Sequence, residues 1–168
     1  MIKIFVAVAV VFVVVVVVVV MFKQEDGSIA GEVSSVVSGN DANNGVLDLS
    51  GQELKKIPDY VFDKTDIQKL DLSNNNLGGS LQAEVRQLQN LKVLNLSNNH
   101  FSGVPAEIGQ LKNLEELNLS NNQITGLPYE LGNLSNLKIL NLRGNDYSQA
   151  DLEIIKKTLP ATTEVLTD

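Results

Sequence analysis

The chain has 168 residues, a formal net charge of −7 from 20 acidic and 13 basic side chains, and no cysteine. An acidic surface repels a phosphate backbone, so nucleic acid is not expected as a partner. The lack of cysteine excludes a disulfide, a thiol nucleophile and a zinc site built on cysteine.

The amino terminus is predicted to be a single-pass membrane anchor over residues 1–23. Residues from Ile4 to Phe22 are all apolar, and a helix of that length roughly spans the ~30 Å hydrocarbon core of a bilayer. The alternative is a removed signal peptide and a secreted product, because Ser28 to Ala30 has the small-x-small pattern of a cleavage site. The apolar run is longer than that of a typical signal peptide, and Lys23 separates it from the cleavage pattern. We therefore expect an uncleaved anchor.

Charges on either side of the apolar run predict its orientation. Lys3 and the terminal amine precede the run, whereas two acidic residues closely follow Lys23. The positive-inside rule then weakly favours a cytoplasmic amino terminus and an extracytoplasmic remainder. Residues 24–43 are rich in Gly, Ser, Asn and Asp, so we expect a flexible linker there, followed by the main domain over residues 44–168.

The main domain is a set of repeats. Four copies follow the pattern L-x-x-L-x-L-x-x-N-x-L, with other apolar residues at some leucine positions, and a weaker copy precedes them. The second leucine recurs every 23 or 24 residues, at Leu47, Leu70, Leu94, Leu117 and Leu140. This pattern resembles the leucine-rich repeat family over about residues 44–160, in its bacterial or plant-like form; repeats of the family are roughly 20–29 residues long.

The repeat pattern predicts its own fold. Leucines two positions apart point to one face of a strand, and so short a strand buries that face only by stacking on neighbouring copies. We therefore expect an α/β solenoid, a curved parallel sheet with short helical turns on its convex side. An asparagine falls where each later copy leaves its strand, and these residues are expected to form an internal polar ladder with the main chain. They are Asn75, Asn99, Asn122 and Asn145.

The convex side and the carboxyl terminus carry their own signals. Gly109 and Gly132 follow apolar residues in the expected helical turns and are predicted to end them. Residues 146–168 are expected to be a C-terminal cap, in which Ser148 begins a capping box and a helix that extends to about Thr158. Apolar side chains on this helix would cover the end of the leucine core, and a last edge strand is expected at residues 164–166.

The leucine-rich repeat resemblance implies a non-catalytic binding function, because the family's usual binding surface is the concave face of its sheet. Strand positions between the leucines are expected to face that surface, where small polar groups and apolar anchors suit a protein or peptide partner. The candidate partner-binding residues are Lys69, Asp71, Val93, Asn95, Glu116, Asn118, Ile139, Asn141 and Arg143. A third outward column is expected to hold Ser50, Ser73, Ser97, Ser120 and Arg143. The alternative is a structural or surface-display spacer that binds envelope glycan, because the repeat template carries many of these residue types by default.

No residue set points to catalysis. His100 is the only histidine and has no cysteine or second histidine with which to bind a metal. Asp48 and Asp71 are expected to lie on adjacent strands, but two carboxylates are a thin ligand set for calcium. No catalytic residue, metal or cofactor is therefore expected, and the chain is not expected to be an enzyme.

Overall fold

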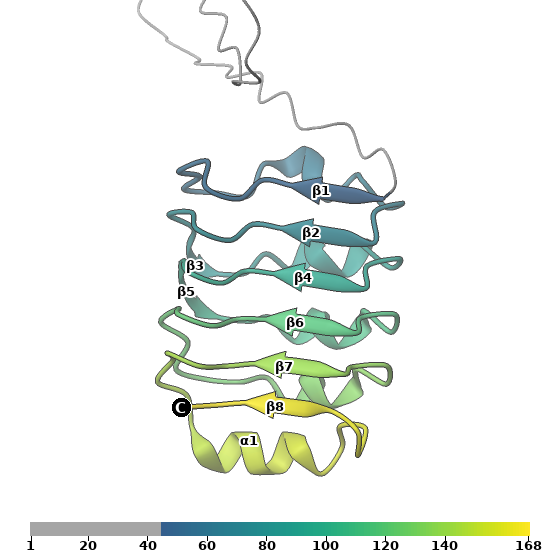
Figure 1. The fold of residues 1–168 in the computed structure, drawn as a ribbon, viewed down its shortest axis with the longest axis vertical. Coiled ribbons are helices and arrows are strands. Elements are labelled where there is room, and N and C mark those ends of the chain that lie inside the picture. The colour runs from purple at the N-terminus through teal and green to yellow at the C-terminus, as the bar shows by residue number, and fades with distance from the viewer. Residues whose placement is uncertain (1–44) are drawn as a thin grey trace, which may run out of the picture. The chain divides into compact units, whose positions relative to one another are not determined.

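The computed structural model describes residues 45–168, and its main feature is a six-stranded parallel sheet (Figure 1). The predicted membrane anchor and linker lie outside the described residues. The strands have three residues each and lie in the order β1-β2-β4-β6-β7-β8. Their bounds are β1 Val46–Asp48, β2 Lys69–Asp71, β4 Val93–Asn95, β6 Glu116–Asn118, β7 Ile139–Asn141 and β8 Glu164–Leu166. Within residues 45–168, no helix is long and apolar enough to cross a membrane.

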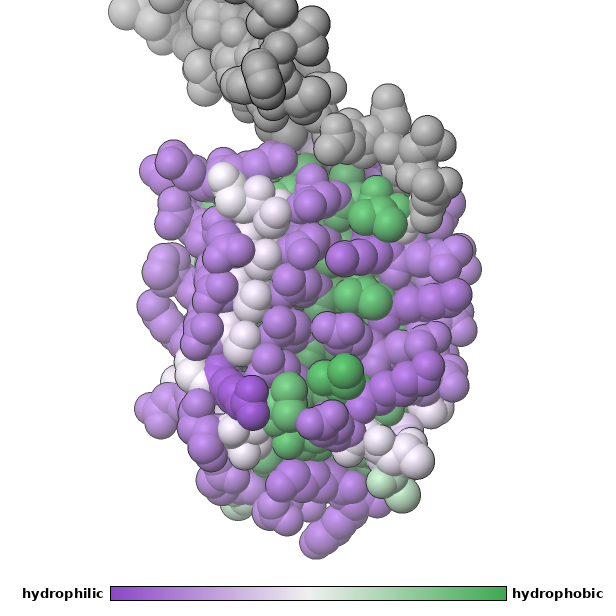
Figure 2. All heavy atoms as spheres, in the orientation of Figure 1, coloured by the Kyte–Doolittle hydropathy of each residue, from purple (hydrophilic) through white to green (hydrophobic). Residues whose placement is uncertain are grey.

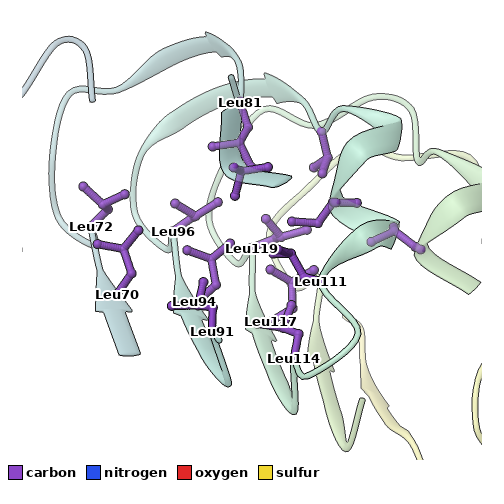
Figure 3. Packing of buried hydrophobic residues seen from close by; sticks show 14 of the residues in the cluster. Leu70, Leu72, Leu81, Leu91, Leu94, Leu96, Leu111, Leu114, Leu117 and Leu119 are labelled. Atoms are coloured by element: carbon purple, nitrogen blue, oxygen red, sulfur yellow. The ribbon is translucent and has the colours of Figure 1, made fainter. Parts of the chain in front are cut away.

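The leucine core lies beneath this sheet because each strand points its middle residue inward. The middle residues are opposite one another in the strand register, and they are Leu47, Leu70, Leu94, Leu117, Leu140 and Val165. The five leucines of this row are at most 2% exposed, and the leucine two positions after each of them is fully buried. Figure 3 shows leucines of successive repeats pointing into the same interior. The predicted stacking of leucine columns is therefore confirmed.

Short 3₁₀-helical turns cover the other side of the core, as expected from the repeat pattern (Figure 1). They are η1 Asp59–Val61, η2 Ala83–Gln87, η3 Ala106–Gln110 and η4 Tyr129–Asn133. Each turn buries at least one apolar side chain against the leucines, namely Val61, Val85, Ile108 and Leu131. A second, two-stranded parallel sheet is formed by β3 (Gly78–Ser80) and β5 (His100–Gly103).

Gly109 and Gly132 do not end the helical turns, so that prediction is wrong. They lie inside η3 and η4, both are buried, and neither has a positive φ angle. A Cβ atom added to Gly109 would lie 2.3 Å from the carbonyl oxygen of Glu130, and one added to Gly132 would lie 1.8 Å from Thr158 Oγ1. Glycine is needed at these positions because the next repeat closely approaches the main chain at Gly109, and the cap closely approaches the main chain at Gly132.

The C-terminal cap has the predicted form. The helix α1 (Gln149–Lys156) is capped at its amino-terminal end by Ser148, whose side chain accepts a hydrogen bond from the Asp151 backbone N–H. The helix ends two residues earlier than expected. Its inward side chains are buried against the last repeat, and they are Leu152, Ile155 and Leu159, the last lying just beyond the helix. The strand β8 follows and pairs in parallel with β7, which closes one end of the sheet.

Candidate binding surface

An internal asparagine ladder fixes the turns after β2, β4, β6 and β7. Asn99 Nδ2 donates hydrogen bonds to the carbonyl oxygens of Leu72 and Leu96 at 3.0 and 3.1 Å, and Asn99 Oδ1 accepts one from the Leu77 N–H at 3.1 Å. The same bonds recur at the other three positions, Asn75, Asn122 and Asn145. The side chain satisfies main-chain groups of two repeats at once, so these asparagines are structural, as predicted.

A second, exposed asparagine ladder was not predicted. Asn121 Nδ2 donates to Asn98 Oδ1 at 2.8 Å, and Asn98 Nδ2 donates to Asn74 Oδ1 at 2.9 Å. All three residues have φ angles of 54–56°, a region that asparagine tolerates better than most residues. Gly144, with a φ of 68°, takes this position in the last repeat. The sequence signal that could have indicated this ladder is the pair of asparagines in each Ser-Asn-Asn triplet. Only the second asparagine of each pair belongs to the internal ladder.

The outward side of the six-stranded sheet, called the strand face below, presents two rows of side chains. The first residues of the six strands form the first row: Val46, Lys69, Val93, Glu116, Ile139 and Glu164. Figure 2, which views this face, shows apolar patches separated by polar side chains along the direction of strand stacking. The structure thus brings the candidate residues of this row together on one surface.

The second row combines occupied and free hydrogen-bonding groups. Leu166 of β8 completes this row, whose polar members are the third strand residues Asp48, Asp71, Asn95, Asn118 and Asn141. The Oδ1 atom of each accepts the backbone N–H two residues later. Asn95 Nδ2 donates to Asp71 Oδ2 at 3.1 Å. In contrast, Asn118 Nδ2 and Asn141 Nδ2 have no protein acceptor among residues 45–168, so they are available to a ligand.

The three middle residues of the third column do not belong to the strand face. Ser73, Ser97 and Ser120 are buried, and the hydroxyl of each donates to the side chain two residues before it. The expectation that these serines face a partner is wrong, because each strand ends two residues before its serine and the serine is buried. Arg143 is exposed at the end of this column, and its Nε donates to the Thr167 carbonyl oxygen at 3.3 Å.

Two carboxylates, one in the second row of the strand face and one next to the first row, are held in their charged form by neighbouring groups. The hydrogen bond from the Ser50 backbone N–H lowers the pKa of Asp48, with a smaller contribution from the charge of Lys69. The hydrogen bond from Lys138 lowers the pKa of Glu115, which is the residue directly before β6. These two carboxylates therefore remain charged at neutral pH.

The two aspartates considered as calcium ligands lie next to each other on the strand face. They are Asp48 and Asp71, which are neighbours in the strand register, as expected. Within residues 45–168, however, no three His, Cys, Asp or Glu side chains come together as metal ligands. His100 is exposed at the start of β5, where its Nδ1 is 3.3 Å from Gln123 Nε2. The described surface can offer apolar contact, charge and hydrogen bonds to a partner.

These features define a solenoid scaffold with an open face of ordered side chains over a packed leucine core. The family model for the leucine rich repeat matches residues 45–101 and 89–146, which together are more than half of the chain. The chain therefore belongs to the leucine-rich repeat family. Modules of this family are commonly protein-binding scaffolds and are typically non-catalytic.

Known proteins resemble this chain over part of its length. The mouse leucine-rich repeat-containing protein 10 is 45% identical over 56 residues, which are 33% of this chain and 20% of that protein. A leucine-rich repeat protein of Leptospira interrogans has a similar structure, with a TM-score of 0.60 and 37% identity over 76% of this chain and 37% of its own. A chain in the BIR3–SERK2 complex of Arabidopsis thaliana has a TM-score of 0.59 and 32% identity, over 73% and 66%. This chain thus spans about a fifth of the mouse relative.

Proposed function

We propose that this chain is a non-catalytic binding module whose strand face recognises a protein or peptide. The observation that carries the proposal is the first row of that face, where Val93 and Ile139 stand partly exposed among charged side chains. Partly exposed apolar groups on an otherwise polar surface are typical of binding anchors. One structural relative comes from a complex of two proteins, BIR3 and SERK2, which supports the same type of function.

The mechanism is recognition by a preformed surface. Main-chain bonds of the sheet and the internal asparagine ladder hold the strands in register, so the face loses little conformational entropy on binding. Val93 and Ile139 provide apolar anchors, Lys69 and Glu116 provide charges of opposite sign, and Arg143 extends the face. Asp71, Asn95, Asn118 and Asn141 contribute the second row. The sum of many modest contacts determines the affinity.

A paired substitution on the strand face should remove binding without unfolding the protein. Val93→Asp with Ile139→Asp replaces both anchors by carboxylates, and each lost apolar contact is worth about 1.5–3 kcal/mol when fully buried by a partner. Peptides that bind the full chain in detergent are first selected from a displayed random library. We expect the affinity of these peptides for the variant to be lower than for the wild type by more than about tenfold. Isothermal titration calorimetry measures the loss, and circular dichroism checks the fold.

The matched control places two carboxylates elsewhere on the described surface. Tyr129 in η4 and Ile154 in α1 are 56% and 46% exposed and lie outside the strand face. Tyr129→Asp with Ile154→Asp should leave the affinity unchanged. If the selected peptides instead lose binding only to this control variant, the strand face is not the binding surface. A spacer would show no difference between the two variants.

We also propose that the repeat domain is displayed outside the cytoplasm by an uncleaved membrane anchor. The support comes from the sequence: residues 4–22 are long and apolar enough to cross a bilayer, and the flanking charges favour a cytoplasmic amino terminus.

Protease added to intact producing cells should digest the repeat domain and leave a membrane-bound fragment that begins at Met1. A mature product that begins at Gly31 would show that the segment is a removed signal. Digestion only after complete lysis, and not after permeabilisation of an outer envelope, would place the domain in the cytoplasm.

A further inference from the structure

The first row of the strand face alternates strictly between apolar and charged side chains. In register order its residues are Val46, Lys69, Val93, Glu116, Ile139 and Glu164. Val46 is 40% exposed, and Val93 and Ile139 are partly exposed. The apolar patches over β1, β4 and β7 in Figure 2 are separated by polar side chains over β2 and β6. A complementary ligand therefore needs apolar groups that recur at every second strand.

The strand spacing turns this alternation into a distance. Neighbouring strands lie about 4.7–4.9 Å apart, so every second strand is about 9.4–9.8 Å away. A polyproline II helix has three residues per turn and a rise of about 3.1 Å, so its same face recurs every ~9.3 Å. An α-helix returns the same face after seven residues, or ~10.5 Å, and an extended strand after two residues, or ~6.7 Å. Over the whole row, the repeat of the polyproline II helix matches the spacing of the apolar side chains, whereas the repeats of the α-helix and the extended strand do not.

The second row supplies what such a ligand lacks. A polyproline II segment makes no internal hydrogen bonds, so its carbonyl oxygens need donors from solvent or a partner. Asn118 Nδ2 and Asn141 Nδ2 are two adjacent donors with no protein acceptor among residues 45–168, and both side chains are only partly buried. They lie beside Glu116 and Ile139 of the first row, next to the proposed path of the ligand.

Charges in the first row add a further condition. Lys69 lies between the first two apolar positions, and Glu116 lies between the second and third. A complementary ligand carries one acidic and one basic residue, each in a different interval between its apolar residues. A ligand with two acidic or two basic residues would face repulsion at one of these positions.

We propose that the partner segment is a proline-rich polyproline II helix that crosses the strands of the sheet, with an apolar side chain at every third residue. Those side chains contact Val46, Val93 and Ile139, and an acidic and a basic residue between them pair with Lys69 and Glu116. This inference rests on the proposed function and specifies the chemistry of the partner at the same surface.

Synthetic peptides of one length, each with three leucines at a different spacing, test this inference. The first has leucine at positions i, i+3 and i+6, proline between them, and one glutamate and one arginine in separate intervals. The second has the same residues with leucine at i, i+2 and i+4, and a third, alanine-based peptide has leucine at i, i+7 and i+14. Fluorescence anisotropy with the full chain in detergent should give the first peptide at least about tenfold higher affinity than the others. Val93→Asp should remove that binding.

Charge variants make the test sharper. A peptide with two glutamates should bind the wild type more weakly than the mixed peptide, and Lys69→Glu should shift the preference to a peptide with two arginines. Equal or tighter binding by the second or third peptide, lost on Val93→Asp, would overturn the polyproline II conformation while leaving the strand face as a binding surface. No binding by the first peptide would overturn the inference too, and the library-selected peptides would still decide the proposed function separately.

Discussion

Replacing Asn99 by aspartate is expected to destabilise the repeat domain more than any other single change of similar size. Asn99 Nδ2 donates to the carbonyl oxygens of Leu72, Leu96 and Ser97, and the side chain is buried. Aspartate would place a carboxylate oxygen against these three acceptors in place of the donor, and the other donors to these acceptors, from Asn75, Asn122 and the Asn74 backbone, cannot relieve that repulsion. A buried charge that faces carbonyl oxygens costs more than a buried unsatisfied polar group, which costs about 1–3 kcal/mol. We expect a loss of at least about 4 kcal/mol, close to the whole stability of many domains.

Thermal unfolding of the full chain, followed by circular dichroism, measures this loss. Asn98→Asp is the matched control, because Asn98 precedes Asn99 directly and is exposed, and within residues 45–168 its side chain bonds only to the side chains of Asn74 and Asn121. Aspartate tolerates the positive φ of Asn98 as asparagine does. The control should lose less than about 1 kcal/mol. Equal melting temperatures for the two variants would contradict a structural role for the internal ladder.

Gly109→Ala is expected to have the second largest effect. The new Cβ would lie 2.3 Å from the carbonyl oxygen and 2.9 Å from the carbonyl carbon of Glu130, both of which are main-chain atoms. A main-chain neighbour cannot rotate away as a side chain can, so η3 and η4 would have to move apart and open the core between two repeats. Overpacking of this kind typically costs about 1–3 kcal/mol and occasionally more, which lowers the melting temperature by roughly 5–10 °C.

Gly126→Ala is a suitable control for this prediction. An added Cβ at Gly126 meets no atom within 4 Å, and its φ is not positive. We expect a change of less than about 0.5 kcal/mol. Chemical denaturation of both variants compares the two sites directly. A Gly109→Ala protein as stable as Gly126→Ala would show that the repeats tolerate a wider spacing than the structure has.

The sequence alone predicted the parts of the fold that depend on periodicity. Leucines two positions apart can bury only one strand face, so the stacked sheet and its leucine core follow from the repeat. The same holds for the internal asparagine ladder and for the cap, where Ser148 and the apolar spacing of α1 act locally.

The state of individual polar groups could not be predicted from the repeat, because it depends on the neighbouring copy. Asn95 and Asn118 occupy equivalent positions, yet only the amide of Asn95 is bonded to its neighbour in the second row. Its neighbour is Asp71, which has a second carboxylate oxygen to accept that bond, whereas the neighbour of Asn118 is an asparagine whose one oxygen is already used. The role of Gly109 could not be predicted from its own repeat either, since the contact that requires glycine comes from the next copy.

The most direct test of the strand face as a binding surface is photo-crosslinking in the cells that produce the chain. A photoreactive amino acid replaces Val93 on the strand face in one variant and Ile154 on α1 in another, both in the full chain. The account predicts a discrete adduct with a protein from position 93 and none from position 154. An adduct from position 154 alone, or no adduct from position 93, would contradict it.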